Sequence, residues 1–126
     1  MEIKIEKLSN ELEEEWKRLK ISQVFQRPEW SKFISITDVI IARNDIGNLI
    51  GVLPFKEKRI GLFKLVTAPS VPLVEENKRG VLVDILNFFK RMDGTKLVET
   101  TYNDFNNGID YRSLGFYTLT KGTQVI

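Results

Sequence analysis

The chain has 126 residues and a mass of 14.6 kDa, which corresponds to one domain over residues 1–126 rather than two. Hydrophobic residues make up 42% and charged residues 29%, and 19 basic against 17 acidic residues leave a net charge of only +2, without the clustered excess of most nucleic-acid-binding proteins. Histidine and cysteine are absent, which excludes Ser-His-Asp and Cys-His nucleophilic sites, disulfides and zinc sites of imidazole or thiolate. Any metal ion would need a carboxylate site of the magnesium or calcium kind, and we expect none.

The first third of the chain predicts a strand and two helices. Ile3 and Ile5 alternate with charged residues, as in a half-buried strand. A helix follows, capped by Ser9 or Asn10, whose apolar residues share one face: Leu8, Leu12, Trp16 and Leu19. Residues 25–30 begin a second short helix, with Pro28 in its first turn.

The middle of the chain predicts an antiparallel meander. Its strands are residues 38–43, 49–55 and 62–67, joined by a turn at 44–48 and by a basic turn at 56–61. Pro69 and Pro72 then remove two ladder donors, so we expect the strand pairing to stop or splay there.

The last third returns to helices. An apolar stripe from Val81 to Met92 predicts the longest helix, with Gly94 at its end, followed by a strand at 95–101. A short helix from Asn103 to Leu114 and a last strand or hairpin over 116–126 complete the chain. This order predicts an α/β (α+β) fold, with a mixed, mainly antiparallel central sheet and helices on both faces.

Two sets of short motifs resemble a known superfamily. Residues 111–116, YRSLGF, resemble the end of the last helix in the N-acetyltransferases called GNAT, and Asp104 stands where that family commonly has asparagine. Residues 25–30 (FQRPEW) and 51–55 (GVLPF), with the basic turn that follows, resemble the first half of FemAB-type transferases, which are duplicated GNAT-like proteins. The resemblance implies a GNAT-like sheet and transfer of an acyl or aminoacyl group to an amine acceptor, either a small molecule or a peptide.

The resemblance also implies an acyl-CoA site before the longest helix, where backbone N–H groups would hold the pyrophosphate. The corresponding residues are Asn77, Lys78, Arg79 and Gly80. Gly80 matches the family's central glycine, whereas Asn77 replaces its Gln or Arg and Leu82 replaces its small last residue. We expect the bulk of Leu82 to hinder phosphate, and the alternative is that Lys78 and Arg79 are solvated charges of a first helical turn.

Tyr111 lies where GNAT enzymes often have the acid that protonates the leaving thiolate. The alternative is a structural role, in which its ring packs with Leu114 and Phe116. Candidate bases are Glu75, Glu76 and Glu99, and Glu99 is expected to be exposed or ion-paired unless it faces inward.

Further predictions from the sequence concern partners and location in the cell. The basic residues Lys56, Lys58, Arg59 and Lys64 could contact RNA or an acidic carrier, but they are more typical of a protected sheet edge, so we do not expect nucleic acid as a partner. No stretch approaches the ~20 apolar residues of a membrane span, and we expect a cytoplasmic protein with no membrane partner. The alternative to an enzyme is a non-catalytic GNAT-like binding module, either a homodimer through Tyr117 to Ile126 or one half of a two-domain FemAB-type unit.

Overall fold

A computed structural model describes residues 1–21, 24–76, 78–99, 111–116, 120–121 and 124–125. Its elements in chain order are β1 (Glu2–Lys7), α1 (Asn10–Trp16), the 3₁₀ turn η1 (Val24–Gln26), α2 (Pro28–Phe33), β2 (Asp38–Arg43), β3 (Leu49–Ile60), β4 (Phe63–Ala68), β5 (Leu73–Val74), α3 (Arg79–Arg91), β6 (Thr95–Val98), β7 (Thr120–Lys121) and β8 (Gln124–Val125).

One mixed sheet organises the molecule. Its strands lie in the order β1-β2-β3-β4-β6, and β5 pairs with β3 beside this path. All neighbours are antiparallel except β4 and β6, which are parallel because the chain crosses over through α3 between them. The predicted fold class is therefore confirmed.

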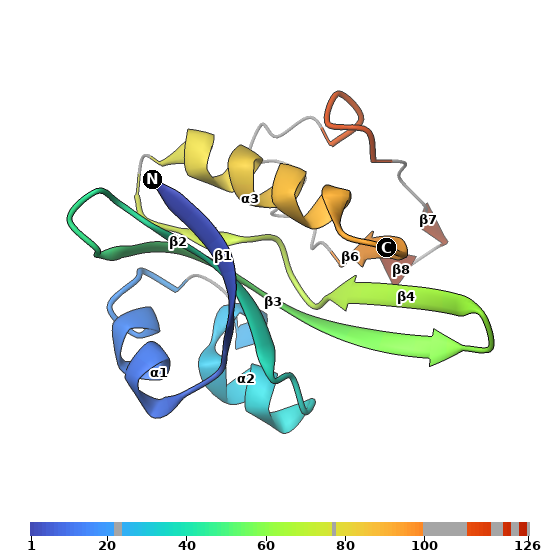
Figure 1. The fold of residues 1–126 in the computed structure, drawn as a ribbon, viewed down its shortest axis with the longest axis horizontal. Helices are drawn as coiled ribbons and strands as arrows, with labels where there is room; N and C mark the ends of the chain where they lie inside the picture. The colour runs from blue at the N-terminus through green and yellow to red at the C-terminus, as the bar shows by residue number, and fades with distance from the viewer. Residues whose placement is uncertain (22–23, 77, 100–110, 117–119, 122–123, 126) are drawn as a thin grey trace.

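Helices cover both faces of the sheet, with α3 on one face and α1 and α2 on the other (Figure 1). Strand β2 serves both layers, because successive side chains of a strand point to opposite faces. Ile40 and Ala42 belong to the core under α3, whereas Val39 and Ile41 belong to the core under α1. Among the described residues, no helix is both long and apolar enough to cross a bilayer.

Local chemistry explains how two of the helices are placed. Ser9 caps α1, since its hydroxyl accepts a hydrogen bond from the backbone N–H of Leu12 at 3.1 Å. Gly51 allows α3 to lie close to β3, because a Cβ at this position would stand 2.7 Å from Ile85 Cδ1 and 3.1 Å from Val81 Cγ1.

The expected basic turn at residues 56–61 is wrong. Residues 56–60 continue strand β3 and pair with β4 in regular antiparallel register, from Lys56 opposite Thr67 to Ile60 opposite Phe63. The reversal is made by the two residues between, Gly61 and Leu62, and Gly61 takes the positive φ of 63° that such a tight turn requires. A run of charged residues such as 56–59 is typical of a turn, but this part of β3 is exposed on both faces and so tolerates charge at every position.

Two expectations near the C-terminus also change. Residues 111–115 form turns and not the end of a helix, and most of the remaining expected helix lies outside the described residues. The described part of 116–126 holds a small hairpin in which β7 pairs with β8, so the hairpin alternative is the one observed. Gly115, with a φ of 90°, supplies the turn that precedes it.

The sheet divides where the two prolines predicted an interruption. Strand β3 pairs with β4 as far as Lys56 opposite Thr67, and then with β5 from Val52 opposite Leu73. The segment between, 68–72, is buried except at Pro69, which is partly buried, and the parallel pairing of β4 with β6 ends here at Ala68 and Val98. In the described part of the chain β5 therefore pairs with β3 but not with β6, and the loop that begins α3 follows directly after this division.

Candidate anion-binding site at the start of helix α3

The start of α3 is held close to the sheet by its backbone. The N–H of Glu75, just after β5, donates to the carbonyl of Ile50 on β3 at 2.8 Å. Lys78 is the N-cap residue, its N–H donates to the carbonyl of Glu75 at 3.1 Å, and no described side chain caps the helix. A helix N-terminus without a side-chain cap presents backbone donors and a positive partial charge, which together favour an anion.

Gly80 lies in the first turn of α3, and its surroundings are open. Its φ is not positive, and no described side chain or neighbouring backbone lies within 4 Å of the place where a Cβ would stand. Neither the backbone conformation nor the packing of the chain therefore requires glycine here, although glycine within a helix costs about 0.5–1 kcal/mol relative to alanine. Close approach of a ligand to the backbone is one reason to keep it.

Leu82 does not obstruct this position, contrary to the expectation from its bulk. Its side chain turns into the core under α3 and is 7% exposed, next to Val81, which is also buried. Lys78, Arg79 and Gly80 are exposed at the helix start, while Asn77 lies outside the described residues. The structure thus brings three of the four predicted pyrophosphate contacts together on one exposed turn.

A cleft of about 500 Å³ borders the loop before α3. It is lined by the end of α1, the β2–β3 turn and the two glutamates of the loop, Glu75 and Glu76. Both glutamates are exposed, and Glu76 lies 3.9 Å from the ammonium group of Lys20. Because the lining carries charges of both signs, the cleft has no strong preference for one sign of ligand, and no motif in the sequence predicts it.

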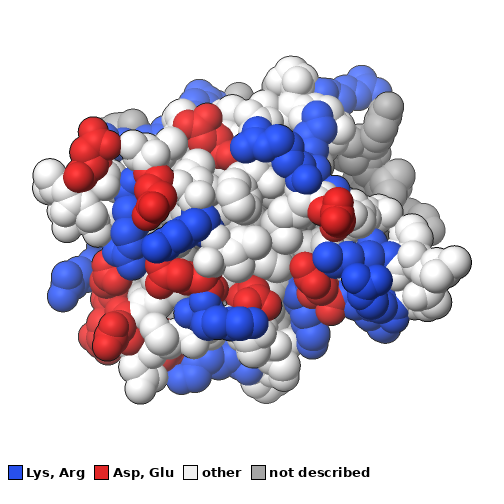
Figure 2. All heavy atoms as spheres, in the orientation of Figure 1, with Lys and Arg blue, Asp and Glu red and all other residues white. Residues whose placement is uncertain are grey.

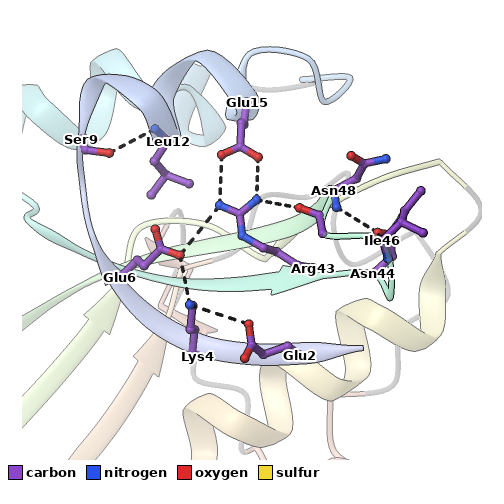
Figure 3. A network of polar contacts seen from close by, with 11 residues as sticks. Glu2, Lys4, Glu6, Ser9, Leu12, Glu15, Arg43, Asn44, Ile46 and Asn48 are labelled. Atoms are coloured by element: carbon purple, nitrogen blue, oxygen red, sulfur yellow. Dashed lines mark hydrogen bonds and ion pairs between the residues drawn. The ribbon is translucent and has the colours of Figure 1, made fainter.

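One wall of this cleft is fixed by a paired carboxylate and guanidinium. Arg43 donates to both carboxylate oxygens of Glu15, at 2.6 and 3.0 Å, and also to the carbonyl of Gly47 at 3.1 Å (Figure 3). The hydrogen bonds from Arg43 lower the pKa of Glu15 below its ordinary value, against the opposing effect of desolvation. This pair joins α1 to the β2–β3 turn, so we assign it a structural role.

Tyr111 is placed by packing. Its residue is 8% exposed in the core under α3, and its ring meets that of Phe116 edge to face with centroids 6.4 Å apart. Leu114 packs against the same core, which agrees with the structural alternative from the sequence. The turn is tied to the far end of α3, since the Lys90 ammonium group donates to the carbonyl of Leu114 at 2.9 Å. Lys90 lies about 16 Å along the helix axis from Arg79, so this contact is remote from the helix start.

Glu99 lies where β4 and β6 cease to pair. Its N–H donates to the carbonyl of Ala68 at 3.0 Å, and the residue is exposed, as expected. Partial burial raises the pKa of its carboxyl group above the ordinary value, and the described residues offer it no ion-pair partner. A raised pKa beside the division of the sheet makes Glu99 the best placed of the three candidate bases. No group of described carboxylates could hold a metal ion.

Comparison with known proteins defines the fold. A probable acetyltransferase matches with a TM-score of 0.65 at 18% identity, over 95% of this chain and 92% of that one. Ribosomal-protein-alanine N-acetyltransferase from Brucella melitensis matches with a TM-score of 0.62 at 20% identity, over 100% and 99% of the two chains. A mutant of the AtaT toxin, bound to the C-terminus of the antitoxin AtaR and acetyl-CoA, matches with a TM-score of 0.58 at 11% identity, over 98% and 89%.

The chain therefore has the fold of GNAT N-acetyltransferases, and the GNAT-like fold predicted from its motifs is confirmed. By sequence, no family model and no curated protein matches it.

Proposed function

We propose that the chain is an acyltransferase that binds the pyrophosphate of an acyl-CoA at the start of α3 and transfers the acyl group to an amine. The observation that carries the proposal is Gly80: it lies open on an uncapped helix start, in a sheet that divides just before that helix. Support for the ligand comes from the acetyl-CoA named with one structural neighbour.

The residues at the helix start have complementary tasks in this proposal. Gly80 lets a phosphate reach the backbone N–H groups of the first turn, which a Cβ would obstruct. Lys78 and Arg79, exposed on the same turn, add charge-assisted hydrogen bonds to phosphate oxygens. Acyl transfer would form a C–N bond to the amine and break the C–S bond of the thioester, so that the amine loses a proton and CoA leaves as the thiol. Glu99, with its raised pKa, is suited to accept the proton from the amine.

Gly80→Ala separates function from structure, because the two roles predict opposite effects. Alanine should stabilise the helix by about 0.5–1 kcal/mol, since the position is open and helical. It should also weaken CoA binding at least tenfold in calorimetry if phosphate contacts the backbone here. Asn87→Ala, two turns further along α3, is the matched control and should leave binding unchanged. Wild-type protein that gives no heat with millimolar CoA would refute the proposal.

The burial of Tyr111 favours a second candidate, a GNAT-like binding module without catalysis. In the family that the motifs resemble, a tyrosine at this place serves as the acid, but here its ring is packed in the core against Phe116. Acyl transfer that is unchanged in Tyr111→Phe would assign the acid to another group. Loss of transfer with unchanged CoA affinity and unfolding free energy would assign it to Tyr111.

The FemAB-type form of this second candidate predicts that the chain pairs with a second copy or a second GNAT-like domain. FemAB-type proteins are duplicated, whereas this chain covers 92% of the neighbour described as a probable acetyltransferase, which is consistent with one GNAT-like unit. Sedimentation equilibrium of the chain should then show a dimer at high concentration. A monomer throughout the concentration range would leave the single-unit enzyme as the better proposal.

A further inference from the structure

The outer half of the β3–β4 hairpin projects beyond the helices on both faces of the sheet (Figure 1). All five residues from Lys56 to Ile60 are exposed, and the hairpin ends at the turn formed by Gly61 and Leu62. A two-stranded ribbon outside the core adds little to the stability of a domain. Packing in the core therefore does not explain which side chains the tip carries.

The tip is apolar. Leu62 in the turn is 105% exposed, and Ile60 and Phe63 beside it are 56% and 51% exposed. Ile60 and Phe63 are directly paired, so their side chains lie on the same face of the ribbon. Protection of a sheet edge accounts for exposed charges but not for three large apolar side chains grouped at one point, which instead indicate a contact surface.

Cations stand directly behind this apolar tip. Lys58 and Arg59 have no carboxylate partner among the described residues. Glu57, the acidic residue of this segment, pairs instead with Lys64 at 3.3 Å. Figure 2 shows the result at the right of the view, where an uncharged end of the molecule adjoins a group of Lys and Arg side chains. The tip is therefore both apolar and positively charged.

From this juxtaposition we propose that the hairpin tip docks on an anionic phospholipid bilayer. Leu62 enters the boundary between headgroups and acyl chains, flanked by Ile60 and Phe63, while Lys58 and Arg59 contact lipid phosphates. A lipid surface suits a convex tip, since it deforms around an apolar point and needs no matching pocket. Single-stranded nucleic acid fits less well, because Phe63 offers a ring for a base to stack on but Leu62, the most exposed residue of the tip, and Ile60 do not.

The test uses the full chain and vesicles of phosphatidylcholine with or without phosphatidylglycerol. The wild-type protein should float with the anionic vesicles and not with the neutral ones, and added salt should reduce the binding. Leu62→Asp should reduce partitioning at least about tenfold, and Lys58→Gln and Arg59→Gln should each reduce it about fivefold. Ile46→Asp is the matched control, because Ile46 is 81% exposed on the other hairpin turn, and it should bind as the wild type does.

A second measurement reports the insertion directly. Leu62 is fully exposed in a turn, so Leu62→Trp should fold normally, and its fluorescence should shift to the blue and be quenched by brominated lipid only with anionic vesicles.

Three results would each overturn the proposal. The first is a failure of the wild type to float with anionic vesicles. The second is a vesicle-free dimer that Leu62→Asp dissociates, which would assign the tip to a second copy of the chain. The third is salt-sensitive binding to a single-stranded oligonucleotide that depends on Lys58 and Arg59, while the fluorescence of Leu62→Trp shows that the new side chain stays in water.

Discussion

The two halves of strand β3 are continuous in the chain but differ in burial and in strand pairing. Residues 49–55 are all buried, with α3 on one face and α1 on the other, whereas residues 56–60 are all exposed. The inner half pairs with β2 and, at residues 51–52, with β5, whereas the outer half pairs with β4 alone among the described strands. The buried half is therefore the one that helices cover and that has neighbouring strands on both sides. The inner half builds the core, and the outer half is free to carry a contact surface.

The largest test of this contrast replaces one side chain in each half. Leu53→Ala should lower the free energy of unfolding by about 2–5 kcal/mol, because it leaves a cavity at a fully buried position. Lys58→Ala in the outer half should change it by less than about 0.5 kcal/mol. Urea denaturation followed by circular dichroism measures both, and equal effects would contradict the division of the strand.

A second test adds volume to the inner half. Gly51→Ala should cost about 1–3 kcal/mol, because the new Cβ would stand 2.7 Å from Ile85 Cδ1 in a packed core. The same urea experiment measures it. A stability equal to that of the wild type would show that α3 is free to move away from β3, and that the inner half is less tightly covered than the structure indicates.

A third test concerns the polar contact that joins α1 to the β2–β3 turn. Hydrogen bonds from Arg43 lower the pKa of Glu15, so the folded state binds fewer protons there than the unfolded state. The resulting stabilisation, at most about 1 kcal/mol, is complete above the ordinary glutamate value of about 4.3 and is lost as the pH falls through the lower folded value. Glu15→Gln should remove this part of the pH dependence in unfolding measurements between neutral and acidic pH.

The smallest expected effect lies in the outer half. Glu57 and Lys64 form an exposed ion pair at 3.3 Å, and exposed pairs contribute little to stability. Glu57→Gln should therefore change the unfolding free energy by less than about 0.5 kcal/mol. It also makes the tip more positive, so binding to anionic vesicles should increase if the tip docks on lipid. A decrease in vesicle binding with unchanged stability would count against that docking.

Much of the fold could be predicted from periodicity and turn residues. The β-branched residues of 38–43 and the apolar stripe from Val81 to Met92 indicate β2 and α3, and Pro69 and Pro72 mark the division of the sheet. The extension of β3 through Lys56–Ile60 could not be predicted, because a ribbon exposed on both faces has neither apolar alternation nor a turn signal. Its two-residue turn depends on the φ of Gly61, which the spacing of apolar residues does not reveal.

The candidate site was harder to predict than the fold. The motif around Gly80 lies at the start of α3, but the direction of the Leu82 side chain depends on the position of Leu82 relative to the core, which the motif does not reveal. The apolar tip of the β3–β4 hairpin is not visible in the sequence pattern. The length of apolar segments detects spanning helices but not three apolar residues at the end of a hairpin.

The parallel pair of strands has a consequence for the order of folding. Strands β1 to β4 pair through antiparallel contacts, and the β2–β3 and β3–β4 pairs are hairpins that close over short loops, whereas β6 joins β4 only after the intervening helix has crossed the sheet. Contacts distant in sequence form late, since the loop-closure entropy must be overcome first. The meander of β2 to β4 should therefore assemble early, and the pairing of β1 with β2 and of β6 with β4, both distant in sequence, should complete the refolding kinetics.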